Sequence, residues 1–464
     1  MQDKKNMARQ VEVAEEHGIS RRQFLARGAA FTLAAAVTGP GLTVLSGCGG
    51  SDSSASGPLE FWQFDAGGGG NSPQAKWYLD VADAWNKDHE TQIKMKYIPV
   101  QDYISGTKLK TGFASGEGPD IFVASSNDFT LYYNNGALQD LTPFIEDGAR
   151  DDFYQNVLAT RMVDDKIYAV PLEVEPLAMY YSVKAFEDAG LSEADIPETW
   201  DQLLEVAGKL KKGDRFGVLF ETNANFYQNF TWYPFMWQGG GDTVAKSGKE
   251  SAFDSKGGVQ ALQFWQDAIE MGVAPRKALG SGAGDLSANL VQGHCAIEEC
   301  GIWGVGDMRQ NAPDFEYGVF KLPVPPGGTY TTNFGGWAWA VSSKGKNPEE
   351  AAKFCVWALG SMSEDSIERG VRWLESDGVM GARKSVVEQA TQRGHFDPEP
   401  MKFFRDEAFP GSRAENRYPP EISKMVNDAI QNCQLGGADP KQTAEQTAQN
   451  IDSFLEGYSG APLI

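Results

Sequence analysis

Acidic and aromatic side chains are the residues of this sequence whose types and spacing could do chemistry. Four glutamates occur in two close pairs: Glu173, Glu175, Glu298 and Glu299. Seven aromatic rings fall within residues 226–237, in the segment NFYQNFTWYPFMWQGGG that starts at Asn225. Two carboxyl groups can act as the acid and the base of a glycoside hydrolase. Carboxylates beside aromatic rings also suit the binding of a sugar without any reaction.

Other catalytic patterns find little support in the sequence. Gly280–Gly284 has the spacing of a nucleophile elbow, but it lies in an expected loop and not at the end of a strand. The run Gly67–Gly70 lacks the lysine of a phosphate-binding loop, and neither a Walker A nor a His-Glu-x-x-His motif occurs. An exported hydrolase that uses the paired glutamates stays as an alternative, because the sequence does not give the distance between them. We therefore expect no enzyme activity, no cofactor and no metal.

The N-terminus has the features of an export signal. Ser20–Leu25 reads SRRQFL, a twin-arginine pattern, and a weakly polar run then leads to the sequence LSGC, which ends at Cys48. We interpret residues 1–47 as a twin-arginine lipoprotein signal, Cys48 as the lipidated residue and 48–58 as that residue with a flexible tether. A single transmembrane anchor is the alternative. The protein is thus expected outside the cytoplasm, held to the cell membrane by lipid.

Charge and cysteine usage limit the partners. The net charge of −22 at pH 7 argues against nucleic acid, which binds clustered Lys and Arg. The other cysteines, Cys295, Cys300, Cys355 and Cys433, have no spacing typical of a metal site. Outside the cytoplasm a disulfide between Cys295 and Cys300 is conceivable, and buried free thiols remain equally open.

Strands alternate with helices along the chain, which indicates an α/β fold with a parallel, doubly wound sheet. The length of 464 residues is too great for one ordinary core, so two lobes are expected. The expected strands are 59–64, 92–98, 121–124, 177–181, 216–220, 295–299 and 333–341. The expected helices are 76–89, 103–114, 201–210, 257–271, 348–359, 418–435 and 440–455. Thr199 and Gln202 predict a capping box in front of one of them.

The aromatic segment predicts a further helix. Phe226, Phe230, Tyr233 and Trp237 recur with the spacing of one helix face, and Gly239–Gly241 would end the helix. We expect this stripe to form core of the second lobe. The entry to the helix follows the expected strand 216–220, so its first residues should face outward at the end of that strand.

Several short segments, taken in order, resemble the family 1 extracellular solute-binding proteins, the maltose-binding-protein-like sugar-binding lipoproteins of ABC importers. These segments are GEGPDI (116–121), GALQDLT (136–142), IYAVP (167–171), PETWD (197–201), QGHCAI (292–297), GIW (301–303) and NPEEAA (347–352). No single segment is specific, but their ordered recurrence from about residue 58 to the C-terminus is.

The resemblance implies a two-lobed periplasmic-binding-protein fold, with a hinge of three chain crossings and a ligand cleft between the lobes. Lobe 1 would comprise 59–172 and 338–380, lobe 2 would comprise 176–332 and 384–464, and the crossings would be 173–175, 333–337 and 381–383. It also implies a monomer whose partners are a small-molecule carbohydrate and the transmembrane subunits of an ABC permease.

A sugar site needs rings over the C–H faces and carboxylates or amides at the hydroxyl groups. Trp62 and Asp65 lie at the C-terminal end of the first expected strand, and Ser126 and Asn127 follow the strand 121–124. Ligands bind at such strand ends in open α/β sheets. Trp62 could instead pack in the core, and Ser126 and Asn127 could merely begin a helix.

The resemblance adds further site residues. Glu175 matches a glutamate that supplies a carboxylate to the sugar, and Trp303 matches a position that often stacks on it. The others expected at the crossings or at the entry to the aromatic helix are Glu173, Asn225, Tyr227, Trp232, Gly336, Trp337 and Arg383. Arg383 would bond the ligand or an acid such as Glu175. A polyamine or another polar solute in the same fold stays open, because acidic and aromatic residues suit it as well.

Overall fold

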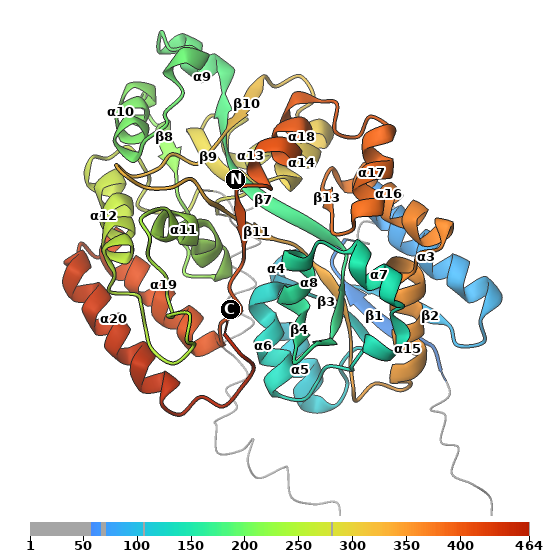
Figure 1. The fold of residues 1–464 in the computed structure, drawn as a ribbon. Coiled ribbons are helices and arrows are strands. Elements are labelled where there is room, and N and C mark those ends of the chain that lie inside the picture. The colour runs from blue at the N-terminus through green and yellow to red at the C-terminus, as the bar shows by residue number, and fades with distance from the viewer. Residues whose placement is uncertain (1–56, 66–70, 105–106, 280–281, 464) are drawn as a thin grey trace, which may run out of the picture. The chain divides into compact units, whose positions relative to one another are not determined.

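The computed structural model describes residues 57–65, 71–104, 107–279 and 282–463. The twin-arginine signal and Cys48 therefore lie outside the described residues. No helix in the described ranges has both the length and the apolar character that a membrane crossing requires. Two β-sheets of five and seven strands organise this part of the chain, and Figure 1 labels many of their strands and helices.

The first sheet is mixed. Its order is β2 (Ile93–Tyr97), β1 (Leu59–Gln63), β3 (Ile121–Ala124), β12 (Ala338–Val341) and β6 (Ala169–Pro171). β1 runs parallel to β2 and β3, as the alternation of strands and helices predicts. However, β12 runs antiparallel to β3 and β6. The prediction of a parallel sheet is wrong for β12, because this strand enters from the second sheet in the opposite direction.

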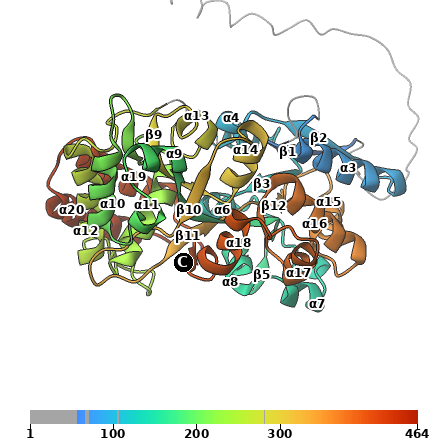
Figure 2. The ribbon, with the colours of Figure 1, turned by 90° about the horizontal axis from the view of Figure 1, so that it is seen from above.

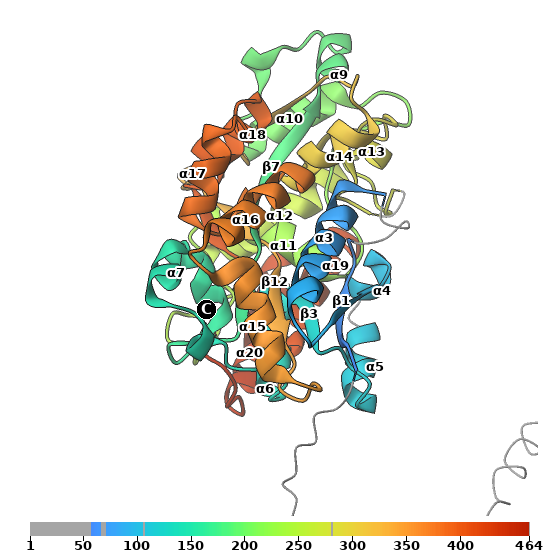
Figure 3. The ribbon, with the colours of Figure 1, turned by 90° about the vertical axis from the view of Figure 1, so that its right-hand side faces the viewer.

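Helices from both halves of the chain accompany this sheet. They are α3 (Pro73–Asp88), α4 (Val100–Ile104), α5 (Thr107–Ser115), α6 (Ser126–Asn134), α7 (Asp147–Asp152), α8 (Gln155–Leu158), α15 (Pro348–Cys355), α16 (Glu364–Asp377) and α17 (Lys384–Gln392). Figure 3 shows α3, α15 and α16 in front of β1, β3 and β12. Trp77 of α3 packs on Trp373 of α16, with ring centroids 4.8 Å apart. Segments almost 300 residues apart in sequence thus share one core.

The second sheet is built around one long strand, β7 (Glu173–Ser182). The order is β14 (Ser412–Ala414), β11 (Thr332–Gly335), β7, β9 (Cys295–Gly301) and β8 (Phe216–Leu219), with β10 (Tyr317–Phe320) and β13 (Met380–Gly381) also paired to β7. Its main helices are α10 (Trp200–Leu210), α11 (Phe226–Gln238), α12 (Lys256–Glu270), α19 (Pro420–Gln434) and α20 (Pro440–Leu455). Figure 2 shows α10, α12 and α20 on the opposite side from α3 and α15. The capping box predicted at Thr199 and Gln202 is confirmed at the start of α10.

Three connections between the sheets lie side by side. The chain leaves β6 and enters β7 at Leu172, and it leaves β11 and enters β12 through Gly336 and Trp337. The third connection passes through β13, which follows α16 and which, like β11, pairs with the first residues of β7. The strand expected over 333–341 is therefore two strands in two sheets. Gly336 makes the break, because its φ of +130° suits glycine and a Cβ there would lie 2.3 Å from the carbonyl oxygen of Glu173.

Helix α11 lies deeper in the fold than a one-face stripe predicts. Asn225 caps it by accepting a hydrogen bond from the Gln228 amide at 3.0 Å, and Gly239 follows its last residue. All its residues from 228 to 238 are buried, including the polar Gln228 and Asn229. Their side chains donate hydrogen bonds to two residues of α19: Gln228 to the Gln434 side chain and Asn229 to the Ser423 carbonyl. The helix is thus surrounded by protein on every side beyond its first turn.

The remaining elements are short. They are β4 (Met162–Val163), β5 (Lys166–Ile167), α9 (Val183–Asp188), α13 (Leu286–Asn289), α14 (Trp303–Asn311) and α18 (Glu399–Phe403), with single turns at 142–144, 159–161 and 193–195 and π-helical turns at 356–360 and 404–408. All four cysteines in the described ranges are free and buried. Cys295 and Cys300 stand an odd number of residues apart on β9, which places them on opposite faces of a regular strand.

Candidate functional site

A cavity of about 350 Å³ lies beside the three connections and is lined by residues that lie in or next to strands of both sheets. The lining residues are Phe64, Asp65, Val100, Ser125, Glu173, Glu175, Glu221, Asn225, Phe226, Tyr227, Phe230, Ala283, Gly284, Trp303, Gly335, Gly336, Trp337, Trp373, Asp377 and Glu415. A larger groove of about 1140 Å³ runs beside α6 and residues 453–462. That groove contains none of the predicted site residues, so the smaller cavity is the candidate site.

Aromatic rings reach the cavity from both sheets. Phe64 follows β1 and meets Trp337 of the second connection, with centroids 4.8 Å apart at 67°. Tyr227, in the first turn of α11, meets Trp303, the first residue of α14, with centroids 6.1 Å apart at 64°. Phe64 comes just after β1 and Trp337 just before β12 of the first sheet, whereas Tyr227 and Trp303 come after β8 and β9 of the second sheet. A flat solute would therefore find ring surfaces on both sides.

Two glycines make room for the rings of the second sheet. A Cβ at Gly301, the last residue of β9, would lie 1.8 Å from the Trp303 ring. A Cβ at Gly284 would lie 2.6 Å from the Tyr227 hydroxyl, and Gly284 has a φ of +89°. The indole Nε1 of Trp303 donates a long bond of 3.4 Å to the Gly284 carbonyl. The Trp303 and Tyr227 rings therefore lie where they do because Gly301 and Gly284, which have no Cβ, let them approach the backbone closely.

Four carboxyl groups of the cavity share an unfavourable environment. Burial raises the pKa of Asp65, Glu173, Glu175 and Asp377. Neighbouring carboxylates raise the pKa of the first three further. Trp373 Nε1 donates to one oxygen of Glu173, and Gln74 donates to Asp377 at 2.8 Å.

The other two acids of the cavity are held by the fold. Glu221 accepts bonds from the amides of Thr222 and Asn223 at 2.7 Å and from that of Ala283 at 3.0 Å. Burial raises the pKa of Glu415 to about 8, although the charge of Arg161 opposes this. Arg161 itself donates to the Gly336 carbonyl at 2.7 Å. These contacts fix loops and the second connection around the cavity.

The structure brings together most, but not all, of the residues predicted from the sequence. Those that line the cavity are Asp65, Glu173, Glu175, Asn225, Tyr227, Trp303, Gly336 and Trp337. Trp62 and Trp232 do not, because each is buried in the core of its own sheet. Ser126 is buried and accepts a bond from Arg161, and Asn127 accepts one from Ser423.

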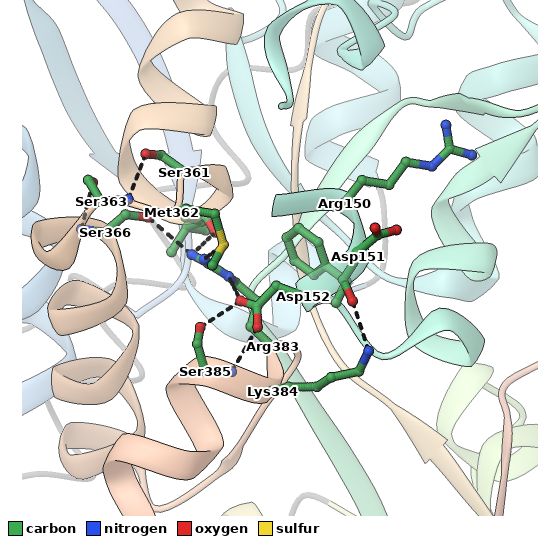
Figure 4. A network of polar contacts seen from close by, with 12 residues as sticks. Arg150, Asp151, Asp152, Ser361, Met362, Ser363, Ser366, Arg383, Lys384 and Ser385 are labelled. Atoms are coloured by element: carbon green, nitrogen blue, oxygen red, sulfur yellow. Dashed lines mark hydrogen bonds and ion pairs between the residues drawn. The ribbon is translucent and has the colours of Figure 1, made fainter. Parts of the chain in front are cut away.

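Arg383 does not line the cavity either. Figure 4 shows it in a buried polar network beside α7 and α17. Its Nε donates to Asp152 Oδ2 at 2.7 Å, and its Nη1 donates to the Leu359 carbonyl at 3.0 Å. The hydroxyl of Ser385 donates to the same Asp152 oxygen at 2.6 Å. The acid that Arg383 binds is thus Asp152, whereas the sequence suggested Glu175, because Arg383 forms a β-bridge with Phe153, the residue directly after α7.

Sequence reasoning missed several lining residues. Trp373 and Asp377 stand four residues apart at the end of α16, a spacing that puts them on one helix face just before the third expected crossing. That spacing could have indicated them. Glu415 and Gly284 come from loops that only the fold brings to the cavity, so no local pattern announces them.

Two α/β sheets joined by adjacent connections, with a cavity beside them, define the class of periplasmic-binding-protein folds. The pattern of the family described as bacterial extracellular solute-binding protein matches residues 69–364, more than half of the chain. This chain therefore belongs to that family, whose members bind solutes and are not enzymes.

Individual proteins resemble the chain at moderate identity. The galactooligosaccharide-binding protein of Bacillus subtilis is 23% identical over 397 residues, which cover 82% of this chain and 87% of that protein. A maltooligosaccharide ABC transporter solute-binding lipoprotein of Streptococcus pneumoniae is 27% identical over 285 residues, 59% of this chain and 63% of that protein. The chain also superposes on the crystal structure of the cyclic α-maltosyl-1,6-maltose binding protein from Arthrobacter globiformis with a TM-score of 0.69 and 23% sequence identity. The superposition covers 87% of this chain and all of that one. The predicted fold is confirmed.

Proposed function

We propose that the protein is the substrate-binding lipoprotein of an ABC importer and that it binds a mono- or oligosaccharide. The observation that carries the proposal is the cavity, where rings attached to both sheets face a group of carboxyls beside the three connections. Such rings cover the C–H faces of a sugar, and the carboxyls accept bonds from its hydroxyls. The galactooligosaccharide-binding relative supports the same solute class.

The hinge gives a route from binding to transport. Glu173 and Glu175 line the cavity and also pair with β13 and β11 in the connections between the sheets. A solute that bonds them therefore contacts the hinge directly. The lobes close on the solute, and the permease recognises the closed form. The lobe bounds 59–172 with 338–380 and 176–332 with 384–464 are part of this proposal.

The route to the membrane is also proposed. Residues 1–47 direct export by the twin-arginine route, and Cys48 receives the lipid. The pneumococcal relative described as a lipoprotein supports the anchor. Metabolic labelling with a fatty acid should mark the wild type, whereas the Cys48→Ser variant should stay unlabelled and leave the membrane fraction. Labelling of that variant would contradict the anchor.

A thermal-shift screen of purified residues 49–464 tests the solute class. A solute present at 100 times its Kd should stabilise the protein by about 2.7 kcal/mol, and at least one saccharide should do so. The panel holds monosaccharides, oligosaccharides and polyamines. A shift with polyamines and with no saccharide would contradict the proposal.

A further inference from the structure

The cavity carries more negative charge than a site for a neutral sugar needs. Asp65, Glu173, Glu175 and Asp377 line it together, and none forms an ion pair with any residue that the structure describes. None of the lining residues in the described ranges is a Lys or an Arg. We propose that the solute is a saccharide with at least one protonated amino group, which these four carboxyls hold. This inference deepens the proposed function and rests on it.

The four carboxyls converge from three segments. Glu173 and Glu175 alternate along β7, so an extended chain points both to one side. Asp65 follows β1, and Asp377 ends α16. The charges of Asp65 and Asp377 act on both glutamates. Three separate elements thus supply one wall of carboxyl groups.

Glu173 shows that this wall is a built site. The residue is 3% exposed and lines the cavity. One of its oxygens accepts the Trp373 indole N–H, and no described residue donates to the other. Glu175, beside it, accepts no hydrogen bond from any residue in the described ranges. A buried carboxylate without donors is costly, and an ammonium group supplies three donors and the opposite charge.

The nearest cations of the chain are used elsewhere. Arg161 bonds Ser126 and the Gly336 carbonyl, and its charge acts on Glu415. Arg309 does not line the cavity. Burial raises the pKa of Asp377 more than the charge of Arg309 lowers it. By contrast, the rings of Tyr227, Phe230 and Trp303 offer faces to a cation as well as to a sugar. The positive charge opposite these carboxyls would therefore come from the solute.

Binding of such a solute should be linked to protons. The pKa values of the four carboxyls are raised in the empty cavity, and a bound ammonium would lower them. Binding would then release protons, and affinity would rise with pH above the ordinary carboxyl pKa of about 4 for as long as the amine of the sugar stays protonated. The other charged or titratable groups that act on them are Tyr78, Arg309 and Glu415, and Glu221 also lines the cavity. The phenol stays neutral because burial raises the pKa of Tyr78, and burial raises the pKa of Glu415 to about 8.

Three disaccharides with one skeleton test the inference. The first is chitobiose, which consists of two glucosamines and carries an amine at C2 of each ring. The second is its di-N-acetyl form, with an amide at C2, and the third is cellobiose, with a hydroxyl at C2. Calorimetry on residues 49–464 at about pH 6, where the amines of glucosamine are protonated, in two buffers of different ionisation enthalpy, gives Kd and the protons released. We expect chitobiose to bind at least ten times more tightly than both neutral sugars, with proton release for chitobiose alone.

Isosteric variants locate the effect. Glu175→Gln and Glu173→Gln remove one charge each and keep the shape, and either should weaken chitobiose at least tenfold and reduce proton release. Glu90→Gln makes the same charge change at an exposed position and should leave Kd unchanged. Equal loss in all three variants would overturn the assignment to the cavity.

The outcomes separate the two proposals. If cellobiose or diacetylchitobiose binds as tightly as chitobiose, the amine is not recognised, but the saccharide function stands. If spermidine binds and no saccharide does, both proposals fall. Failure of chitobiose and glucosamine to bind at all overturns the amino-sugar inference by itself.

Discussion

Acidic residues near the connections of this protein are found in two opposite environments. Asp152 lies beside the third connection and is paired with Arg383 at 2.7 Å, with a further bond from the Ser385 hydroxyl. Glu173 and Glu175 lie beside the first connection and face the cavity without a cation. The chain therefore neutralises the acid that fixes helices α7 and α17 together. The acids of the cavity have no such cation from the described residues, so a bound solute would have to supply it.

The difference separates stability from function. Leaving one partner of a buried ion pair alone costs about 3–5 kcal/mol, so the Asp152 network holds the fold only while it is complete. Cavity acids that repel one another reduce stability in the empty protein. A solute that supplies the missing charge can recover that free energy as affinity. Four changes of single residues test this division.

Arg383→Met should have the largest effect. It leaves the buried Asp152 carboxylate without its cation, and the free energy of unfolding should fall by about 3–5 kcal/mol, as measured by urea unfolding of the ligand-free protein. Arg393→Met breaks a surface pair with Glu368 and should cost much less. Equal losses in the two variants would show that the buried pair has no special part in stability.

Trp303→Ala should act on binding and leave the fold intact. Covering about 100 Å² of ring surface contributes about 2.5 kcal/mol, so the affinity for a saccharide should fall by about 10- to 100-fold. The Trp357→Ala variant removes a partly buried indole outside the cavity that packs on Trp85. It should lower the melting temperature and leave the affinity unchanged. If Trp303→Ala unfolds the protein, its ring belongs to the core.

Ser385→Ala tests the smaller contact of the paired network. Its hydroxyl donates to Asp152 Oδ2 at 2.6 Å, and hydrogen bonds to charged groups contribute about 1.5–3 kcal/mol. Because the Ser385 amide and Arg383 still bond Asp152, we expect a loss at the low end, about 1.5 kcal/mol. A loss as large as that of Arg383→Met would shift the main contribution from the arginine to the serine.

Glu175→Gln should stabilise the empty protein slightly. The pKa of Glu175 is raised above its usual 4.5 by burial and by Asp377. The folded protein thus keeps a proton that the unfolded chain has lost, and stability falls as pH rises above about 4.5. Glutamine does not titrate, so the variant should be about 1 kcal/mol more stable at pH 8. That gain should disappear near pH 4. A destabilised variant at pH 8 would mean that Glu175 has a donor and belongs with Asp152.

Local patterns predicted most elements. The helix predicted at 440–455 is observed with the same bounds, and the helix at 201–210 begins one residue earlier, because apolar spacing and caps act within one turn. The strand predicted at 333–341 failed, since its alternation continues through Gly336 while the chain changes sheets. An alternating pattern indicates which residues are extended, but it does not indicate which strands they pair with.

Site prediction shows the same division. The sequence by itself determined that acids and rings cluster at Glu173, Glu175, Tyr227 and Trp303, because strand ends and the family's ordered segments are local features. Only the tertiary structure decided that Asp377 and Asp65 join the two glutamates, that Trp62 and Trp232 pack in cores, and that Arg383 binds Asp152. Burial and charge pairing depend on which distant segments meet. That is set by how the two sheets pack around their connections.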